Sequence, residues 1–205
     1  MLTWKSKYQL VGEQVAGISG TLIDVGARDR ILHKYLPNEL TYRSADVVPG
    51  HDLLWNLEEP IESPNEAHDI VVALDVLEHL EQIHQAYKEL LRITRHKLFI
   101  SLPNMTGLAF RWDFLTTGRL SGKYDLLPEH QGDRHRWLTS YPQACTFIYH
   151  HAQVANCTVK QYDILFGYGR AHNLVARLPL PPALRTYTIL FEITKNRSTS
   201  NGEQS

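Results

Sequence analysis

The stretch Leu22-Ile23-Asp24-Val25-Gly26-Ala27-Arg28-Asp29-Arg30 decides the fold of this chain. Its apolar start is typical of a buried strand, and the Asp-x-Gly that follows is typical of a backbone turn beneath a ligand, where a Cβ would block close approach. Asp46 follows Gly26 by twenty positions, at the expected tip of the next strand. A carboxylate there is placed to bind ribose hydroxyls. The pattern therefore predicts a nucleoside site at the carboxyl edge of a parallel sheet.

The rest of the chain alternates between strand and helix patterns. The run 69–74 is continuously apolar after Asp69, as a strand covered on both faces should be, and 80–94 carries one apolar helical face. We expect strands at 21–25, 40–46, 51–57, 69–74, 97–102, 158–166 and 187–193. We expect helices at 4–18, 29–36, 80–94 and 141–155. This rhythm predicts an α/β, Rossmann-like, doubly wound sheet with right-handed crossovers.

One long segment, 104–139, has no clear period. It mixes charges with Trp112, Phe114 and Trp137, and a stretch of this length is more often functional than structureless. We expect a lid there, whose aromatic residues line an acceptor pocket or close a second core. The domain prediction is one unit at 1–195 with a polar, disordered tail at 196–205.

Composition limits the function classes. The 205 residues are 43% hydrophobic with a net charge of -1, which argues against a general nucleic-acid binder. The two cysteines form no metal or disulfide pattern. The N-terminus lacks a signal-peptide core, and no apolar run approaches the roughly 20 residues that cross a bilayer. We expect a cytoplasmic protein without a membrane span or a nucleic-acid partner, and leave its oligomeric state open.

Nicotinamide dinucleotides and S-adenosylmethionine are the two ligands that commonly use a glycine turn followed by an acidic ribose contact. A dinucleotide needs further glycines beneath its pyrophosphate, but Arg28 and Arg30 occupy those positions. None of the tyrosines has a lysine four residues on, as a short-chain reductase would require. The residues therefore favour the methyl donor.

Two further elements carry a resemblance. Leu74-Asp75-Val76-Leu77-Glu78-His79-Leu80 and Ser101-Leu102-Pro103-Asn104 each follow an expected strand. Here the chain resembles class I S-adenosylmethionine-dependent methyltransferases, within them the small-molecule branch with ubiquinone-pathway O-methyltransferases. The resemblance covers 21–104 and extends loosely through 133–137 and the last strand. It implies seven strands with the last antiparallel, and an enzyme that methylates a small-molecule acceptor at oxygen.

The same resemblance implies a nucleoside site built by the second and third strands. Asp46 would bind the ribose hydroxyls, and Val47 would pack on the adenine. Asn56 would recognise the adenine by its side chain and Leu57 by its backbone N–H.

The methionine end of the cofactor would lie against Asp24, Gly26, Leu74 and Asp75, with the last two beside the sulfonium. One departure matters, because the family's Gly-x-Gly-x-Gly appears here as Gly26-Ala27-Arg28-Asp29-Arg30. Arg28 would either bind the methionine carboxylate by a charge-assisted contact or block the site. The second reading predicts a catalytically inactive, methyltransferase-like binding or scaffold protein.

Much of the catalysis of methyl transfer comes from positioning the acceptor against the sulfonium. A general base helps when the acceptor is a hydroxyl group. The catalytic candidates are His79, His130 and His135, because imidazole titrates near neutral pH. His79 has the alternative role of orienting the following helix. The Asp75-x-x-Glu78-His79 motif also offers ligands for a divalent ion. Similar Glu-x-x-Glu-His groups hold a metal in some relatives, but the first position here is Asp, and we expect no metal.

Overall fold

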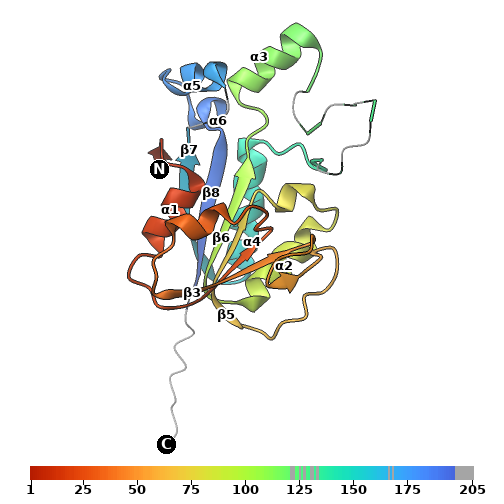
Figure 1. Ribbon diagram of the computed structural model, residues 1–205. Coiled ribbons are helices and arrows are strands. Elements are labelled where there is room, and N and C mark those ends of the chain that lie inside the picture. Colours follow the sequence, from red (N-terminus) through yellow and green to blue (C-terminus); the bar gives the residue numbers. More distant parts are fainter. Residues whose placement is uncertain are drawn as a thin grey trace, which may run out of the picture.

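The computed structural model describes residues 1–120, 123–124, 126, 128–129, 132, 134–165, 167 and 169–196. Within these residues eight strands form one sheet in the order β1-β7-β8-β6-β5-β2-β3-β4 (Figure 1). The strands are β1 (Leu2–Thr3), β2 (Gly20–Val25), β3 (Leu40–Asp46), β4 (Leu53–Leu54), β5 (His68–Leu74), β6 (Thr94–Pro103), β7 (Cys157–Ile164) and β8 (Thr188–Lys195). β8 runs antiparallel to both neighbours, and the other pairs are parallel. The predicted doubly wound fold with an antiparallel last strand is confirmed.

Two strands differ from the expected seven. The two-residue β1 is an additional edge strand that pairs with β7, at residues for which the sequence pattern predicts neither strand nor helix. The strand expected at 51–57 is only Leu53–Leu54, because it pairs with β3 over two residues at the opposite edge. Both elements are too short to show an alternating pattern.

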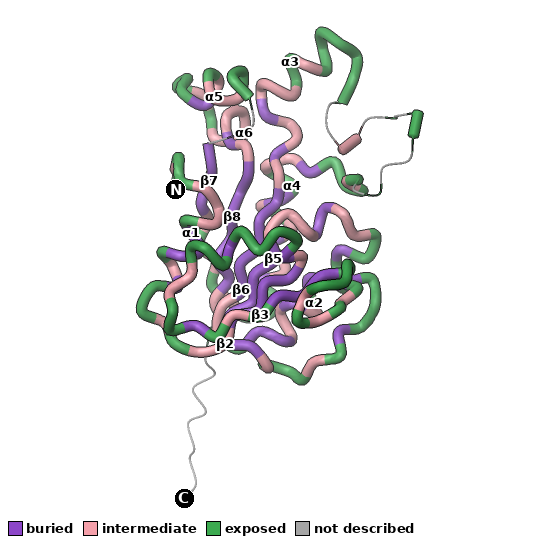
Figure 2. Tube along the Cα trace, viewed as in Figure 1, coloured by how far each residue is buried: buried purple, intermediate pink, exposed green. Residues whose placement is uncertain are grey.

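The helices cover both faces of the sheet. α1 (Lys7–Gln14) and the 3-10 helix η1 (Ile31–Tyr35) lie on one face, and α2 (Ile83–Ile93) and α4 (Tyr141–Val154) on the other (Figure 1). In β5, Ile70 and Val72 pack toward α1, while Val71 and Ala73 pack toward α2 and α4, and all four are fully buried. Figure 2 shows the central strands as the buried part of the molecule. Burial on both faces explains the continuous apolar run.

Two expected helices are shorter than their apolar patterns. The helix expected at 4–18 is α1, because Ser6 caps it in a capping box with Gln9 and it ends at Gln14. The helix expected at 29–36 is the five-residue η1, preceded by Arg30 in a left-handed conformation.

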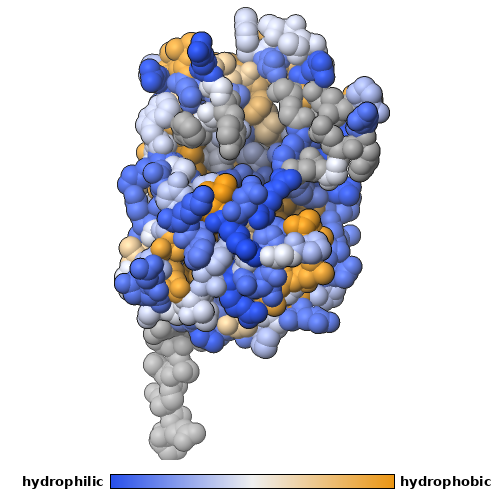
Figure 3. Space-filling view, viewed as in Figure 1, coloured by the Kyte–Doolittle hydropathy of each residue, from blue (hydrophilic) through white to orange (hydrophobic). Residues whose placement is uncertain are grey.

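Three short helices gather at the carboxyl end of the sheet: α3 (Leu108–Thr117), α5 (Arg170–Ala176) and α6 (Pro182–Arg185) (Figure 1). α3 lies inside the expected lid at 104–139, where the sequence has no clear period. None of its residues is buried, and its apolar side chains form no stripe. Figure 3 shows hydrophobic surface over α5 beside strongly hydrophilic residues. None of the described helices has the length and apolar character to span a membrane. His130, Asp133, Phe166 and the tail beyond Asn196 lie outside the described residues.

Candidate functional site

The turn after β2 keeps the backbone of a glycine-rich loop. Gly26 has φ +73°, and a Cβ added there would lie 2.4 Å from Cγ2 of Val76, so only glycine fits. Arg28 and Arg30 have φ of 41° and 51°, in the left-handed region that favours glycine. These two arginines thus adopt a conformation that glycine adopts freely, at a cost of about 1 kcal/mol each.

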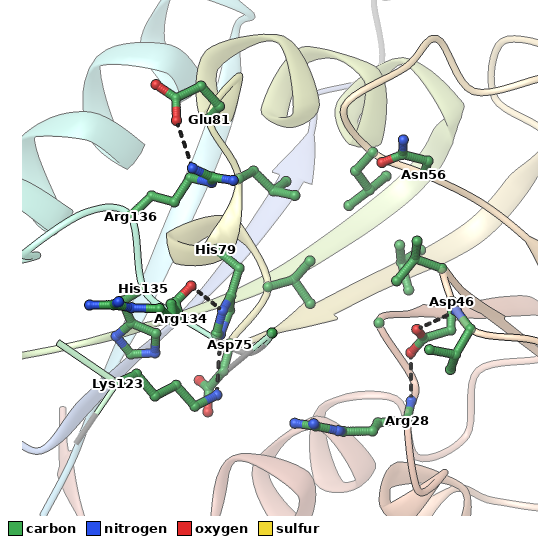
Figure 4. Close-up of a pocket in the computed structure, with 18 residues that line it drawn as sticks. Arg28, Asp46, Asn56, Asp75, His79, Glu81, Lys123, Arg134, His135 and Arg136 are labelled. Carbon is green, nitrogen blue, oxygen red and sulfur yellow. Dashed lines mark hydrogen bonds and ion pairs between the residues drawn. The ribbon is translucent and has the colours of Figure 1, made fainter. Parts of the chain in front are cut away.

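The two arginines of this turn have different roles. Nε of Arg30 donates to Oγ of Ser44 at 3.2 Å, and its guanidinium also donates to the Gly50 carbonyl, which ties the turn to the loop after β3. Arg28 donates its backbone N–H to Oδ2 of Asp46 at 2.9 Å. Its side chain points away from Asp46 along the floor of a cavity (Figure 4). Arg30 is not part of that cavity's lining.

A cavity of about 1050 Å³ opens where β2, β3 and β5 end. Its lining contains nine of the residues that the sequence singles out: Gly26, Arg28, Asp46, Val47, Asn56, Leu57, Asp75, His79 and His135. Asp24 and Leu74 line an adjacent cavity of about 170 Å³, which shares Gly26, Arg28 and Asp75 with the large one. His130, the third catalytic candidate, lies outside the described residues.

Asp46 presents an oriented carboxylate to the large cavity. Its Oδ2 accepts from the Arg28 N–H, and its Oδ1 accepts from the Val48 N–H at 3.2 Å. Each carboxylate oxygen keeps a further lone pair. Val47 and Val48 beside it are 65% and 48% exposed, which is unusual for valine and leaves an apolar surface next to the carboxylate.

The Asn56 side chain is partly committed to its own loop. Its Nδ2 donates to Oε1 of Glu59 at 3.0 Å, and its Oδ1 accepts from the Glu58 N–H at 3.1 Å. One N–H of the amide group remains for a ligand. Leu57 is buried, and both residues line the cavity.

Asp24 lies beneath the turn. It is 4% exposed and accepts a hydrogen bond from the Tyr42 hydroxyl at 3.0 Å. Burial raises the pKa of Asp24 to about 7, against the opposing effect of the Tyr42 hydrogen bond. This carboxyl group therefore titrates near neutral pH.

Asp75 is held in a fixed position after β5. It has φ +55°; Oγ of Ser101 donates to its Oδ1 at 2.5 Å and accepts from its backbone N–H at 2.9 Å. Its Oδ2 is paired with the ammonium group of Lys7 from α1. Burial acts to raise the pKa of Asp75, but the Lys7 charge and the hydrogen bonds from Lys7 and Ser101 together outweigh it, and the pKa is below its ordinary value. Sequence reasoning missed Lys7, which lies 68 positions before its partner.

Glu78 is in the opposite situation. It lies on the 3-10 helix η2 (Leu77–His79), is fully buried, and neither carboxylate oxygen has a hydrogen-bond partner among the described residues. Burial, followed by the Asp75 charge, raises its pKa well above the ordinary value. Nε2 of His135 is 3.9 Å from its Oε1.

Of the three catalytic candidates, His79 and His135 are described, and they lie against each other beside Glu78. Their rings meet edge to face with centroids 4.6 Å apart. Nδ1 of His79 donates to the Arg134 carbonyl at 2.9 Å, which leaves Nε2 as the acceptor of the neutral ring, 3.4 Å from Nζ of Lys123. Nδ1 of His135 is 3.2 Å from the Tyr124 hydroxyl. One ligand atom from each of Glu78, His79 and His135 lies within 4.8 Å of the others.

A third cavity, of about 530 Å³, adjoins this cluster. It shares Asp75, Lys123 and His135 with the large cavity. Its apolar walls come from segments far apart in the chain: Tyr8, Met105, Phe110, Ile164 and Tyr187. Of the lid aromatics, Phe110 therefore reaches a cavity, stacked with Tyr187 at a centroid distance of 6.2 Å.

The other lid aromatics do not line these cavities. Trp112 and Phe114 are 64% and 51% exposed on α3, so they neither close a second core nor face an acceptor cavity. Trp137 is 41% exposed and donates its Nε1–H to the Leu80 carbonyl at 2.7 Å.

Solved structures share this architecture. The CurJ carbon methyltransferase is 13% identical, with a TM-score of 0.58 over 93% of this chain and 54% of that one, so the chain spans about half its length. An S-adenosylmethionine-dependent methyltransferase from Aquifex aeolicus is 12% identical (TM-score 0.53; 93% and 90% covered). One from Archaeoglobus fulgidus is 13% identical (TM-score 0.53; 94% and 96% covered). At these identities the likeness establishes the class I methyltransferase fold.

Comparisons of the sequence with curated proteins and with family models identify one family. No curated protein matches the chain. The ubiquinone-pathway branch of the resemblance is not confirmed. A family model described as methionine biosynthesis protein MetW matches residues 47–164, which is more than half of the sequence. The chain belongs to the MetW family.

Proposed function

We propose that this chain binds S-adenosylmethionine at the carboxyl edge of the sheet and transfers its methyl group to a small molecule, at an oxygen atom. The observation that carries the proposal is the Asp46 carboxylate, fixed by two backbone N–H groups at the rim of a cavity of about 1050 Å³. Such a carboxylate, with a lone pair left on each oxygen, suits the two ribose hydroxyls of a nucleoside.

The three cavities suggest how the donor and acceptor are arranged. The adenosine part of the donor would occupy the large cavity, with the adenine between Val47 and the Asn56–Leu57 segment. Its methionine end would occupy the small cavity beside Leu74 and Asp75. The acceptor would enter the cavity of about 530 Å³. The cavities share Asp75 and Lys123, so the sulfonium and the acceptor would meet there.

Placing the two reactants in line supplies most of the catalysis of such a displacement. A base would accept the proton of a hydroxyl acceptor. His135 is the better placed histidine, because it lines both the donor and the acceptor cavity. His79 lines the donor cavity alone and is held by the Arg134 carbonyl. The role of His130 stays a prediction.

A divalent metal fits the residues beside this base. Glu78 is a buried carboxylate without a hydrogen-bond donor among the described residues, and a cation is one way to compensate it. Together with His79 and His135 it offers the mixed carboxylate and imidazole ligands that zinc, manganese or iron accept. A bound ion would act as a Lewis acid on an acceptor oxygen. The alternative is a proton on Glu78, in keeping with its raised pKa.

Isothermal titration calorimetry with S-adenosylmethionine and S-adenosylhomocysteine tests the proposal. We expect both to bind, and Asp46→Ala to weaken binding about 100-fold, because two charge-assisted hydrogen bonds are lost. Asp113→Ala on α3, outside the large cavity, is the control that should bind like the wild type. Failure of the folded wild-type protein to bind either ligand would end the proposal.

The competing function is a binding or scaffold protein that holds the donor without turning it over. The family description, which names a biosynthesis protein rather than a transfer reaction, favours keeping this alternative. Incubation with isotopically labelled S-adenosylmethionine and a library of small hydroxylated metabolites separates the two. Label transfer with release of S-adenosylhomocysteine supports the enzyme, and donor binding without release supports the scaffold. The cytoplasmic location also stays a prediction.

A further inference from the structure

Lys7 reaches the centre of the site from outside its motifs. It is the first residue of α1, directly after the Ser6 cap, so its backbone is fixed by the capping box. Its side chain is 15% exposed and its ammonium group is paired with the Asp75 carboxylate. Lys7 and Asp75 together line the small cavity and the acceptor cavity. The N-terminal helix therefore places a cation where the methionine end of a donor would lie.

The small cavity has the charges that an amino-acid group requires. Asp75 supplies an ionised carboxylate, since its pKa is lowered, and Lys7 supplies an ammonium beside it. The cavity adjoins the large one and shares Gly26, Arg28 and Asp75 with it. A ligand with its nucleoside on Asp46 would thus extend its amino-acid end toward this ion pair.

Binding of such a ligand creates a requirement at Lys7. The ligand's ammonium group would compete for Asp75, a carboxylate in the lining of this cavity. A largely buried ammonium that loses its partner is costly, so Lys7 would need another anion. The carboxylate of the same amino-acid group supplies it.

We propose that Lys7 binds the carboxylate of the donor's methionine end while Asp75 takes its ammonium, so that α1 is part of the donor site. The inference rests on the proposed donor, and it transfers to Lys7 a contact that the sequence offered to Arg28. Lys7 is the better candidate because it is mostly buried beside Asp75, whereas Arg28 is an exposed residue.

The test compares S-adenosylmethionine with its decarboxylated analogue, which keeps the ammonium and lacks only the carboxylate. We expect Lys7→Met to weaken S-adenosylmethionine about tenfold or more, the loss of one charge-assisted hydrogen bond. The analogue should bind Lys7→Met as well as, or better than, it binds the wild type, because Asp75 is released for its ammonium. Lys7→Arg should keep the wild-type preference.

Two control variants make the result specific. Lys5→Met removes a nearby lysine that pairs with Glu13 on the surface, and it should leave both affinities unchanged. Arg28→Met should leave the ratio of the two affinities unchanged. Equal affinities of Lys7→Met and the wild type for S-adenosylmethionine, or equal weakening of both ligands, would overturn the inference. A wild-type protein that binds neither ligand would instead contradict the proposed function.

Discussion

The proposed site has a donor side, formed by the cavities of about 1050 and 170 Å³, and an acceptor side, formed by the cavity of about 530 Å³. They meet at two carboxyl groups that lie three residues apart and whose pKa values are shifted in opposite directions. Asp75 has a lysine and a serine hydroxyl on its two oxygens, and its pKa is lowered. Glu78 has no hydrogen-bond donor among the described residues, and its pKa is raised well above normal. The donor side thus carries a charge that its own fold compensates. The acceptor side carries a group that needs a proton or a cation.

Removing the charge of Asp75 should give the largest change in stability. Asp75→Asn leaves the Lys7 ammonium without its anion, and breaking a buried pair costs about 3–5 kcal/mol. Because the Asp75 side chain is 36% exposed, we expect about 2 kcal/mol at pH 7, measured by urea unfolding. A depressed pKa stabilises above the unfolded value and loses this contribution as the pH falls, so the difference should shrink toward pH 3.

The control for this experiment is Lys5→Met, which removes a surface pair and should cost well under 1 kcal/mol. If Asp75→Asn were as stable as the wild type at pH 7, the proposed contrast between the two carboxyl groups would be contradicted. The pair would then contribute nothing to the folded donor side.

Glu78 should have the opposite pH dependence. A raised pKa contributes stability that is complete at low pH and is lost as the pH rises through the folded-state value. The isosteric Glu78→Gln should therefore be close to the wild type in stability near pH 4 and more stable near pH 8. Asp24→Asn should behave in the same way with a midpoint near pH 7, because the pKa of Asp24 is about 7. Thermal unfolding across this pH range measures both.

Titration with Mn²⁺ or Zn²⁺ sharpens the result for Glu78. An ion held by Glu78, His79 and His135 would stabilise the wild type at pH 8 by about 2.7 kcal/mol at a hundredfold excess over Kd, and its melting temperature would rise accordingly. Glu78→Gln would lose this gain, and Asp24→Asn would keep it. A wild type that gains nothing from either ion, yet shows the pH dependence, has a proton on Glu78.

The two sides also differ in what the sequence predicts. Gly26, Asp46 and the Asn56–Leu57 pair follow strand ends within a short span, and parallel strands bring such residues to one edge, so the large cavity follows from the pattern. The acceptor cavity joins Tyr8, Phe110 and Tyr187, which no local pattern connects. The same holds for the pairing of Lys7 with Asp75.

Other features depend on burial, which single residues do not reveal. Trp112 and Phe114 read as core or pocket residues, but α3 buries none of its side chains. The sequence shows Glu78 only as part of a motif. That its carboxylate oxygens lack hydrogen-bond partners among the described residues follows only from the groups packed around it. Arg28 and Arg30 stand where the family pattern has glycine, and their backbone lies in the left-handed region that favours glycine, which the sequence does not reveal.

Replacing these arginines should give the smallest change in stability. The Arg28 variant also tests whether its side chain blocks the cavity proposed for the donor. Arg28→Gly relieves about 1 kcal/mol of left-handed strain and adds about 0.5–1 kcal/mol of unfolded-chain entropy, so stability should change by less than about 0.5 kcal/mol. Arg30→Gly also loses contacts with Ser44 and Gly50 and should be less stable by about 1 kcal/mol. Urea unfolding measures the stability of both variants, and isothermal titration calorimetry measures their affinity for the donor. We expect Arg28→Gly to bind S-adenosylmethionine within about twofold of the wild type, since the proposed site assigns the donor's carboxylate to Lys7. If only Arg28→Gly bound the donor, the native side chain would be closing the cavity, and the protein would be the non-catalytic relative.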